Sequence, residues 1–119
     1  MSHRTVLGLV RDLFFRSKLD AVAESAGTTL IYASDLESAA RQCAAHGPSL
    51  VIVDLSDSTF GTAEDTARKI RESAPDARIV GFASHIDLKP LKAARAAGFE
   101  AALSRSEFTA RLPEFLGAR

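Results

Sequence analysis

The sequence has a single cysteine, Cys43, and no formal net charge across its 119 residues. One cysteine excludes an internal disulfide and a metal site made only of cysteines, and it fits the reducing cytoplasm, where we expect the protein. Lys and Arg are scattered along the chain. This distribution argues against nucleic acid as a partner, because a phosphate-binding surface needs clustered basic residues.

Long apolar runs are also missing from the chain. None approaches the roughly 20 residues that cross a bilayer, and the start Met-Ser-His-Arg-Thr lacks the apolar core of a secretory signal, so we expect no membrane association. Hydrophobic residues still make up 46% of the sequence, which is enough for one packed core. We therefore expect a single domain over residues 1–119.

The most informative stretch is a short apolar run, Leu50–Val53, that leads directly into Asp54. Gly47–Pro48 precede the run and a polar stretch follows it, which is typical of a strand buried on both faces. Such strands belong to parallel sheets that helices cover on each side. Asp54 should then lie at the carboxyl end of its strand, where ligands and chemistry collect in open α/β sheets.

Segments of strand and helix character alternate along the chain. The expected strands cover residues 5–10, 29–33, 50–54, 78–83 and 100–103. The expected helices lie between and after them: Asp12 to Gly27, a helix opened by a Ser34-x-x-Glu37 capping box, 63–73, 88–97, and a last helix capped by Ser106 and kinked or shortened by Pro113.

This βαβαβαβαβα order predicts an α/β fold with a five-stranded parallel sheet. Right-handed crossovers place helices on both faces, and the expected strand order is 2-1-3-4-5, the flavodoxin-like arrangement. The switch point then falls between the first and third strands. Arg11 and Asp12, which follow the first strand, should face Asp54 across one crevice.

The chain resembles the receiver domain of bacterial two-component response regulators, the CheY-like fold, over essentially its whole length. That family has an acidic pair after the first strand, a phosphorylated Asp after the third, a Thr or Ser after the fourth and a Lys after the fifth. The resemblance makes Asp54 the candidate phospho-acceptor and Asp12 the second acid of the pair. It also makes Asp12 and Asp54 candidate magnesium ligands.

Several positions depart from the family pattern. Arg11 replaces the first acid, and the hydroxyl position falls on Ala83, with Ser84 one place later. Arg105 replaces the lysine, and Ser106 follows it where the family usually has proline. The chain therefore resembles the degenerate, pseudo-receiver branch, with Arg11, Ala83, Ser84 and Arg105 as the candidate switch and cation positions.

Phosphoryl transfer to a carboxylate needs a magnesium ion beside the nucleophile and fixed cations around the transferred oxygens. Arg11 adds positive charge where the divalent cation would sit. Our hypothesis is that Arg11 or Arg105 pairs with Asp54 and replaces the metal, so that the domain holds one conformation without phosphorylation. Asp12 is explained equally well as an N-cap of the first helix.

These residues predict a non-enzymatic signalling module that acts through a protein partner, such as a histidine kinase or a downstream signalling protein, without a cofactor. The resemblance implies a partner or homodimer surface on the fourth helix, fifth strand and fifth helix. One alternative is a conventional receiver that uses Asp54 and magnesium. A second is a small flavodoxin-like ligand-binding domain, although no glycine-rich phosphate loop follows the first strand.

Overall fold

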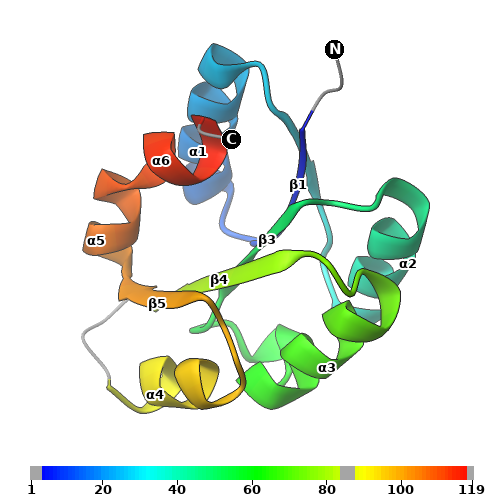
Figure 1. Ribbon diagram of the computed structural model, residues 1–119. Helices are drawn as coiled ribbons and strands as arrows, with labels where there is room; N and C mark the ends of the chain where they lie inside the picture. Colours follow the sequence, from blue (N-terminus) through cyan, green and yellow to red (C-terminus); the bar gives the residue numbers. More distant parts are fainter. Residues whose placement is uncertain (1–3, 84–87, 118–119) are drawn as a thin grey trace.

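The computed structural model describes residues 4–83 and 88–117, which form one parallel sheet with helices around it (Figure 1). The strands are β1 (Thr5–Leu9), β2 (Thr29–Tyr32), β3 (Leu50–Asp54), β4 (Arg78–Ala83) and β5 (Ala101–Ser104), in the order β2-β1-β3-β4-β5. The helices are α1 (Leu13–Ala26), α2 (Leu36–His46), α3 (Ala63–Ser73), α4 (Leu88–Ala96), α5 (Arg105–Ala110) and α6 (Leu112–Gly117), with the 3₁₀ turn η1 (Ser58–Phe60) before α3. The predicted fold class and strand order are confirmed.

Two apolar cores lie on opposite faces of the sheet, each under one of the two helix layers that Figure 1 shows. Helices α1, α5 and α6 pack on one face, and α2, α3 and α4 pack on the other. Strand β3 is buried along its whole length, since it lies at the centre of the sheet between β1 and β4. No helix among the described residues has the length and apolar character needed to cross a membrane.

Helix ends follow the chemistry of their capping side chains, with two corrections to the predicted caps. Asp12 caps α1, and Gly27 ends it with a φ of +70°, both as predicted. Helix α2 is capped by Asp35 and Ser38 instead of Ser34 and Glu37. A Ser34-x-x-Glu37 pattern and an Asp35-x-x-Ser38 pattern overlap by one residue, and the Asp carboxylate is the stronger acceptor for backbone N–H groups.

The last helix is capped by Ser104 instead of Ser106, so Arg105 is its first helical residue. Glu107 completes the capping box, since its backbone N–H donates to the Ser104 hydroxyl and its side chain accepts the Ser104 N–H. The helix ends at Ala110, and α6 begins at Leu112. Pro113 lacks an N–H and cannot continue a helix from α5, which explains the predicted break.

The strand register brings the carboxyl ends of four strands to one edge of the sheet. Leu9 pairs with Val53, Asp54 pairs with Phe82, and Ala83 pairs with Ser104. The carboxyl ends of β1, β3, β4 and β5 therefore lie side by side. This edge holds the site that the sequence predicts.

A row of aromatic rings fills the core beneath α1 and α5. Phe15 and Phe82 have ring centres 4.8 Å apart, Phe82 and Phe108 stack at 5.1 Å, and Phe108 and Phe115 stack at 5.2 Å. Ring pairs at these spacings attract each other beyond the area that they bury. The row begins directly under the edge of the sheet where Arg105 lies.

Candidate functional site

Asp54 ends β3 as a nearly buried acid, with 7% of its surface exposed. Its Oδ1 atom accepts a hydrogen bond of 3.0 Å from the Ser56 N–H. Burial raises the pKa of the Asp54 carboxyl above its ordinary value, while the Ser56 N–H and the positive charge of Arg105 act in the opposite direction. The Asp54 carboxyl group is thus largely shielded from water.

Arg11 forms an ion pair with Asp57, a residue of the loop after β3. The Arg11 Nε–H donates to Asp57 Oδ2 at 2.7 Å, and an Nη2–H donates to Oδ1 at 3.2 Å. This two-point contact lowers the pKa of the Asp57 carboxyl to about 2. It ties the segment after β1 to the segment after β3.

Asp12 is both the cap of α1 and the partner of Arg105. Its Oδ1 accepts the backbone N–H groups of Phe14 at 2.9 Å and Phe15 at 3.2 Å. Its Oδ2 lies 3.2 Å from Arg105 Nη1. The Phe15 N–H, ahead of Arg105, lowers the pKa of the Asp12 carboxyl. This pair joins the segment after β5 to the segment after β1.

Arg105 also lies over the aromatic row. Its guanidinium carbon is 4.7 Å from the ring centre of Phe15 and 5.5 Å from that of Phe82. A planar guanidinium stacks on aromatic faces in a way that a lysine ammonium does not. Within the described residues, the Arg105 Nε is a buried nitrogen without a hydrogen-bond partner.

The structure corrects one part of the sequence hypothesis. Both arginines do form ion pairs at this edge, but the pairs join Arg11 to Asp57 and Arg105 to Asp12, instead of joining either arginine to Asp54. Arg105 and Arg11 still act on Asp54 through their charge. The two arginines pair with Asp12 and Asp57 because these acids lie on the loops beside them, whereas the Asp54 carboxylate lies at the end of a buried strand.

The residues at this edge do not fit a magnesium ion as they are arranged. Asp12 already accepts two backbone N–H groups and the Arg105 guanidinium, and both oxygens of Asp57 face Arg11. Across residues 4–83 and 88–117, no cluster of three or more Asp, Glu, His or Cys side chains could hold a metal ion. A divalent cation would have to displace an arginine from at least one of its carboxylates.

The remaining predicted positions divide into two groups. Ala83 lies at the end of β4 and is buried, and it offers a methyl group where the family pattern has a hydroxyl. Ser84 lies outside the described residues. Asp57 was missed by the sequence interpretation. The signal for Asp57 in the sequence is a pair of opposite charges. Arg11 is a base where the family pattern has an acid, and Asp57 is an acid three residues after Asp54.

Comparisons with known proteins agree with this geometry at the level of the fold. Neither a protein-family model nor a curated protein matches the sequence. A response regulator from Thermotoga maritima superposes with a TM-score of 0.77 at 17% identity, covering 98% of this chain and 100% of that one. The chain has the receiver fold of two-component response regulators.

Two further solved structures are similar to this chain. A two-component response regulator of the LuxR family from Aurantimonas has a TM-score of 0.76 at 23% identity, covering 96% of this receiver-fold chain and 81% of that chain. The receiver domain of a sensor histidine kinase from Pseudomonas aeruginosa, with a magnesium ion coordinated in its active-site cleft, has a TM-score of 0.74 at 15% identity, covering 98% and 100% of the two chains.

Proposed function

We propose that this protein is a pseudo-receiver, a non-enzymatic signalling module of a two-component or phosphorelay system that works by protein–protein contact. Two internal ion pairs take the place of the magnesium ion and the phosphoryl group. The observation that carries the proposal is that Arg11 and Arg105 each hold one of the carboxylates that surround Asp54.

The two ion pairs connect three segments at the same edge of the sheet. Arg11–Asp57 joins the loops after β1 and β3, and Arg105–Asp12 joins the first turn of α5 to the loop after β1. Each segment thus has a fixed charge partner supplied by another segment. The edge can keep one arrangement without a metal ion, so the module would present one constant surface to its partner.

The decisive experiment is to offer the protein both ligands of a conventional receiver. We expect that magnesium at millimolar concentration leaves the amide NMR signals of Asp12, Asp54 and Asp57 in place, and that beryllofluoride does not bind. We also expect an unchanged intact mass after incubation with a small acyl phosphate and magnesium. A gain of one phosphoryl group that Asp54→Asn abolishes would overturn the proposal.

A second candidate is the conventional receiver, phosphorylated on Asp54. Two observations favour it: neither arginine forms an ion pair with Asp54, and the Arg105 Nε remains a buried donor without a partner within the described residues. A donor of this kind could donate a hydrogen bond to an oxygen of an incoming phosphoryl group. The mass measurement separates the two candidates directly.

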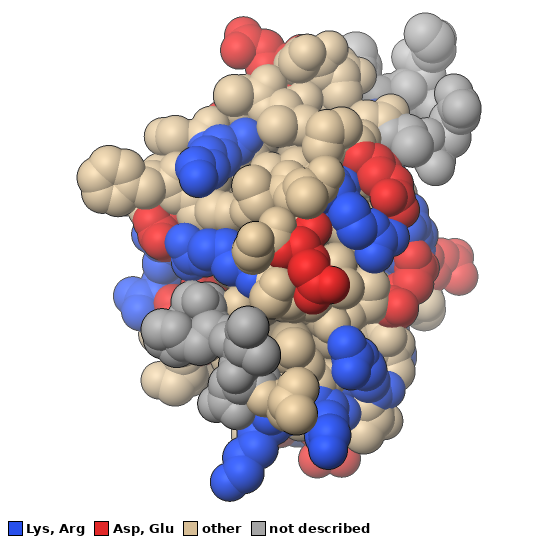
Figure 2. Space-filling model, turned by 90° about the vertical axis from the view of Figure 1, so that its left-hand side faces the viewer, with Lys and Arg blue, Asp and Glu red and all other residues tan. Residues whose placement is uncertain are grey.

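The partner surface that we propose lies on α4, β5 and α5, which Figure 2 displays from the left-hand side of Figure 1. Lys and Arg side chains gather at the bottom of this view, over α4, whereas acidic and basic side chains are mixed above it. Helix α4 carries Lys89, Lys92 and Arg95 and has no acidic residue. We therefore expect a partner, or a second copy of the chain, to place acidic side chains against α4.

A further inference from the structure

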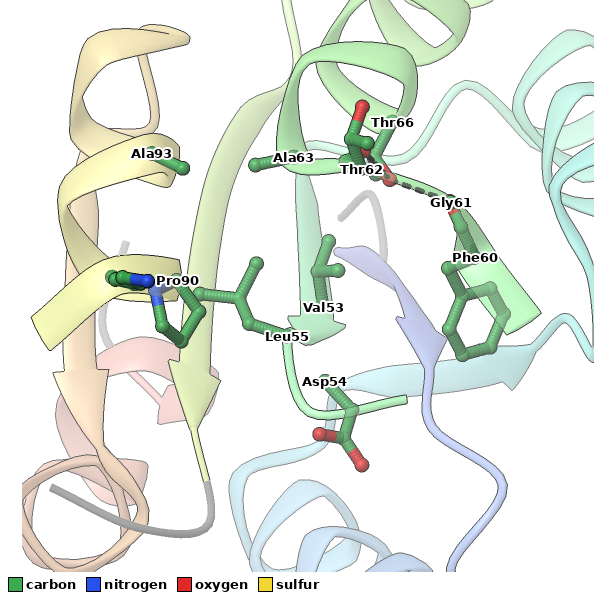
Figure 3. A pocket seen from close by; sticks show the side chains of 11 residues that line it. Val53, Asp54, Leu55, Phe60, Gly61, Thr62, Ala63, Thr66, Pro90 and Ala93 are labelled. Carbon is green, nitrogen blue, oxygen red and sulfur yellow. Dashed lines mark hydrogen bonds between the residues drawn. The ribbon is translucent and has the colours of Figure 1, made fainter. Parts of the chain in front are cut away.

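A cavity of about 280 Å³ lies between α3 and α4, next to Asp54 (Figure 3). Its walls come from the end of β3, the η1 turn, the first turns of α3 and the first turns of α4. Most of the lining is apolar and comes from Val53, Leu55, Phe60, Ala63 and Ala93. This volume is close to the lower limit of cavities that bind small molecules.

Short side chains keep this space open. Ala63 of α3 and Ala93 of α4 point toward each other across it in Figure 3, and neither is long enough to close the gap. Leu55 lies flat against β4, since a Cβ atom added to Gly81 would be only 2.8 Å from its Cδ1 atom. Leu55 therefore lines the cavity instead of filling it.

The polar groups of the wall already have partners inside the protein. The Thr66 hydroxyl lies 2.9 Å from the Phe60 carbonyl oxygen and 3.0 Å from that of Thr62. The Thr62 hydroxyl accepts the Asp65 N–H, and Asp54 accepts the Ser56 N–H. A water molecule among the apolar side chains of the cavity would find few hydrogen-bonding partners, and a charged group placed there would lose hydration without compensation.

The charges at the cavity's edge also favour an uncharged occupant. Asp54 and Lys89 both contribute to the lining and carry opposite charges. In Figure 3 the Asp54 carboxylate lies at the lower end of the cavity, below Val53 and away from Ala63 and Ala93. The central part of the cavity is therefore bounded by carbon atoms.

We propose that this cavity binds a compact, uncharged and mainly apolar molecule of the size of one or two fused aromatic rings. An apolar cavity of ~150 Å³ can hold benzene. The larger volume here leaves room for a bicyclic ring with one small polar substituent. The proposal goes beyond the pseudo-receiver function and is independent of whether Asp54 accepts a phosphoryl group.

Indole is a suitable probe, since it is bicyclic, neutral and mainly apolar. We expect an indole titration of the full chain to shift the amide NMR signals of Val53, Leu55, Thr66 and Ala93. Indole-3-acetate and tryptamine carry the same rings with a negative and a positive group. Each should bind at least about fivefold more weakly than indole, because the central part of the cavity is bounded by carbon atoms and the charged group would lose its hydration there.

Two variants test the location. Ala93→Leu should be tolerated because Ala93 is exposed on α4, and its larger side chain fills the cavity from one wall. Ala63→Leu fills it from the opposite wall. Both should weaken indole binding at least about tenfold, whereas Ala45→Leu on the exposed side of α2 should not.

Several results would overturn the proposal. They are the absence of shifts at the lining residues up to the solubility of indole, unchanged affinity in both filled variants, or tighter binding of either charged analogue. The amide spectra of the variants also show whether each remains folded. Shifts confined to residues away from α3, α4 and β3 would place the binding elsewhere and count against the cavity.

Discussion

The Arg11 guanidinium donates two hydrogen bonds to the Asp57 carboxylate, at 2.7 and 3.2 Å. Asp57 is at the same time the cap of η1, because its Oδ1 accepts the Thr59 N–H at 3.0 Å. The pair therefore fixes the start of the loop that carries the chain from Asp54 to α3. The state of this pair can be measured directly through the titration of Asp57.

We predict that the Asp57 carboxyl titrates near pH 2 in the native protein, because its bond with Arg11 lowers its pKa to about 2. A carboxyl with a lowered folded-state pKa stabilises the fold above its unfolded pKa, and that contribution is lost as the pH falls from about 4 to about 2. In Arg11→Gln the midpoint should rise most of the way toward about 3.9. Carboxyl-carbon NMR measures both midpoints, and equal values would show that Arg11 has no effect on Asp57.

A second prediction concerns the charge at position 11. Arg11→Asp removes the base that occupies Asp57 and adds a carboxylate beside Asp12, which creates an oxygen-rich site of the kind that magnesium prefers. We expect this variant to bind magnesium at least about tenfold more tightly than the native protein, as measured by an NMR titration. Lys18→Asp makes the same charge change on an exposed part of α1 and is the matched control. Equal gains in the two variants would mean that net charge alone is responsible.

The position of Arg105 gives a third prediction. Arg105→Lys restores the family residue but loses the stacking over Phe15 and Phe82, so the free energy of unfolding should fall by about 0.5–2 kcal/mol. Urea denaturation measures the change. Arg68→Lys is the control, because Arg68 makes an exposed ion pair within α3, and it should leave the stability nearly unchanged. A lysine variant as stable as the native protein would show that the stacking contributes nothing.

The fold was predictable from the sequence, and the ion pairs were not. Buried runs such as Leu50–Val53 are marked by composition alone, and their alternation with helical patterns determines the strand order. The partner of an arginine depends instead on the path of a loop. Asp57 pairs with Arg11 and also caps η1, and its spacing of three residues from Asp54 does not reveal that turn.

The helix caps were also only partly predictable from the sequence. Both Ser34 and Asp35 have a side chain suited to the start of α2, and only the structure shows that Asp35 is the cap. For the last helix, the capping box uses Ser104 and Glu107, so Arg105 moves from the predicted loop into the first turn. That shift helps to place the Arg105 guanidinium over Phe15.

A fourth prediction separates the two roles of Asp12. Asp12→Asn keeps an oxygen that can accept the N–H groups of Phe14 and Phe15, whereas Asp12→Ala loses the cap of α1. We expect the alanine variant to be less stable than the asparagine variant by about 1 kcal/mol, as measured by urea denaturation. Equal stability of the two variants would mean that the cap contributes nothing, and the loss that both share relative to the native protein would then measure the ion pair with Arg105.

The last prediction concerns Asp54, whose carboxyl has a pKa raised mainly by burial. A raised pKa means that the folded state binds the proton more tightly than the unfolded state, so the ionised carboxylate opposes folding once the pH exceeds its unfolded pKa. Asp54→Asn keeps the shape and can still accept the Ser56 N–H, but it carries no charge to desolvate. We therefore expect Asp54→Asn to be more stable than the native protein near pH 7.

The gain should shrink as the pH falls from the raised folded-state pKa toward about 4, and it should be absent below that, where the native carboxyl is protonated in both the folded and the unfolded state. Urea denaturation at several pH values tests this dependence, with Asp76→Asn as the control, because Asp76 is exposed in the turn between α3 and β4. A loss of stability in Asp54→Asn near pH 7 would mean that the charge of Arg105 outweighs the cost of burial. In that case the acid would be a stabilising member of the charge network, and the arginine would already act as its counter-ion across the distance that separates them.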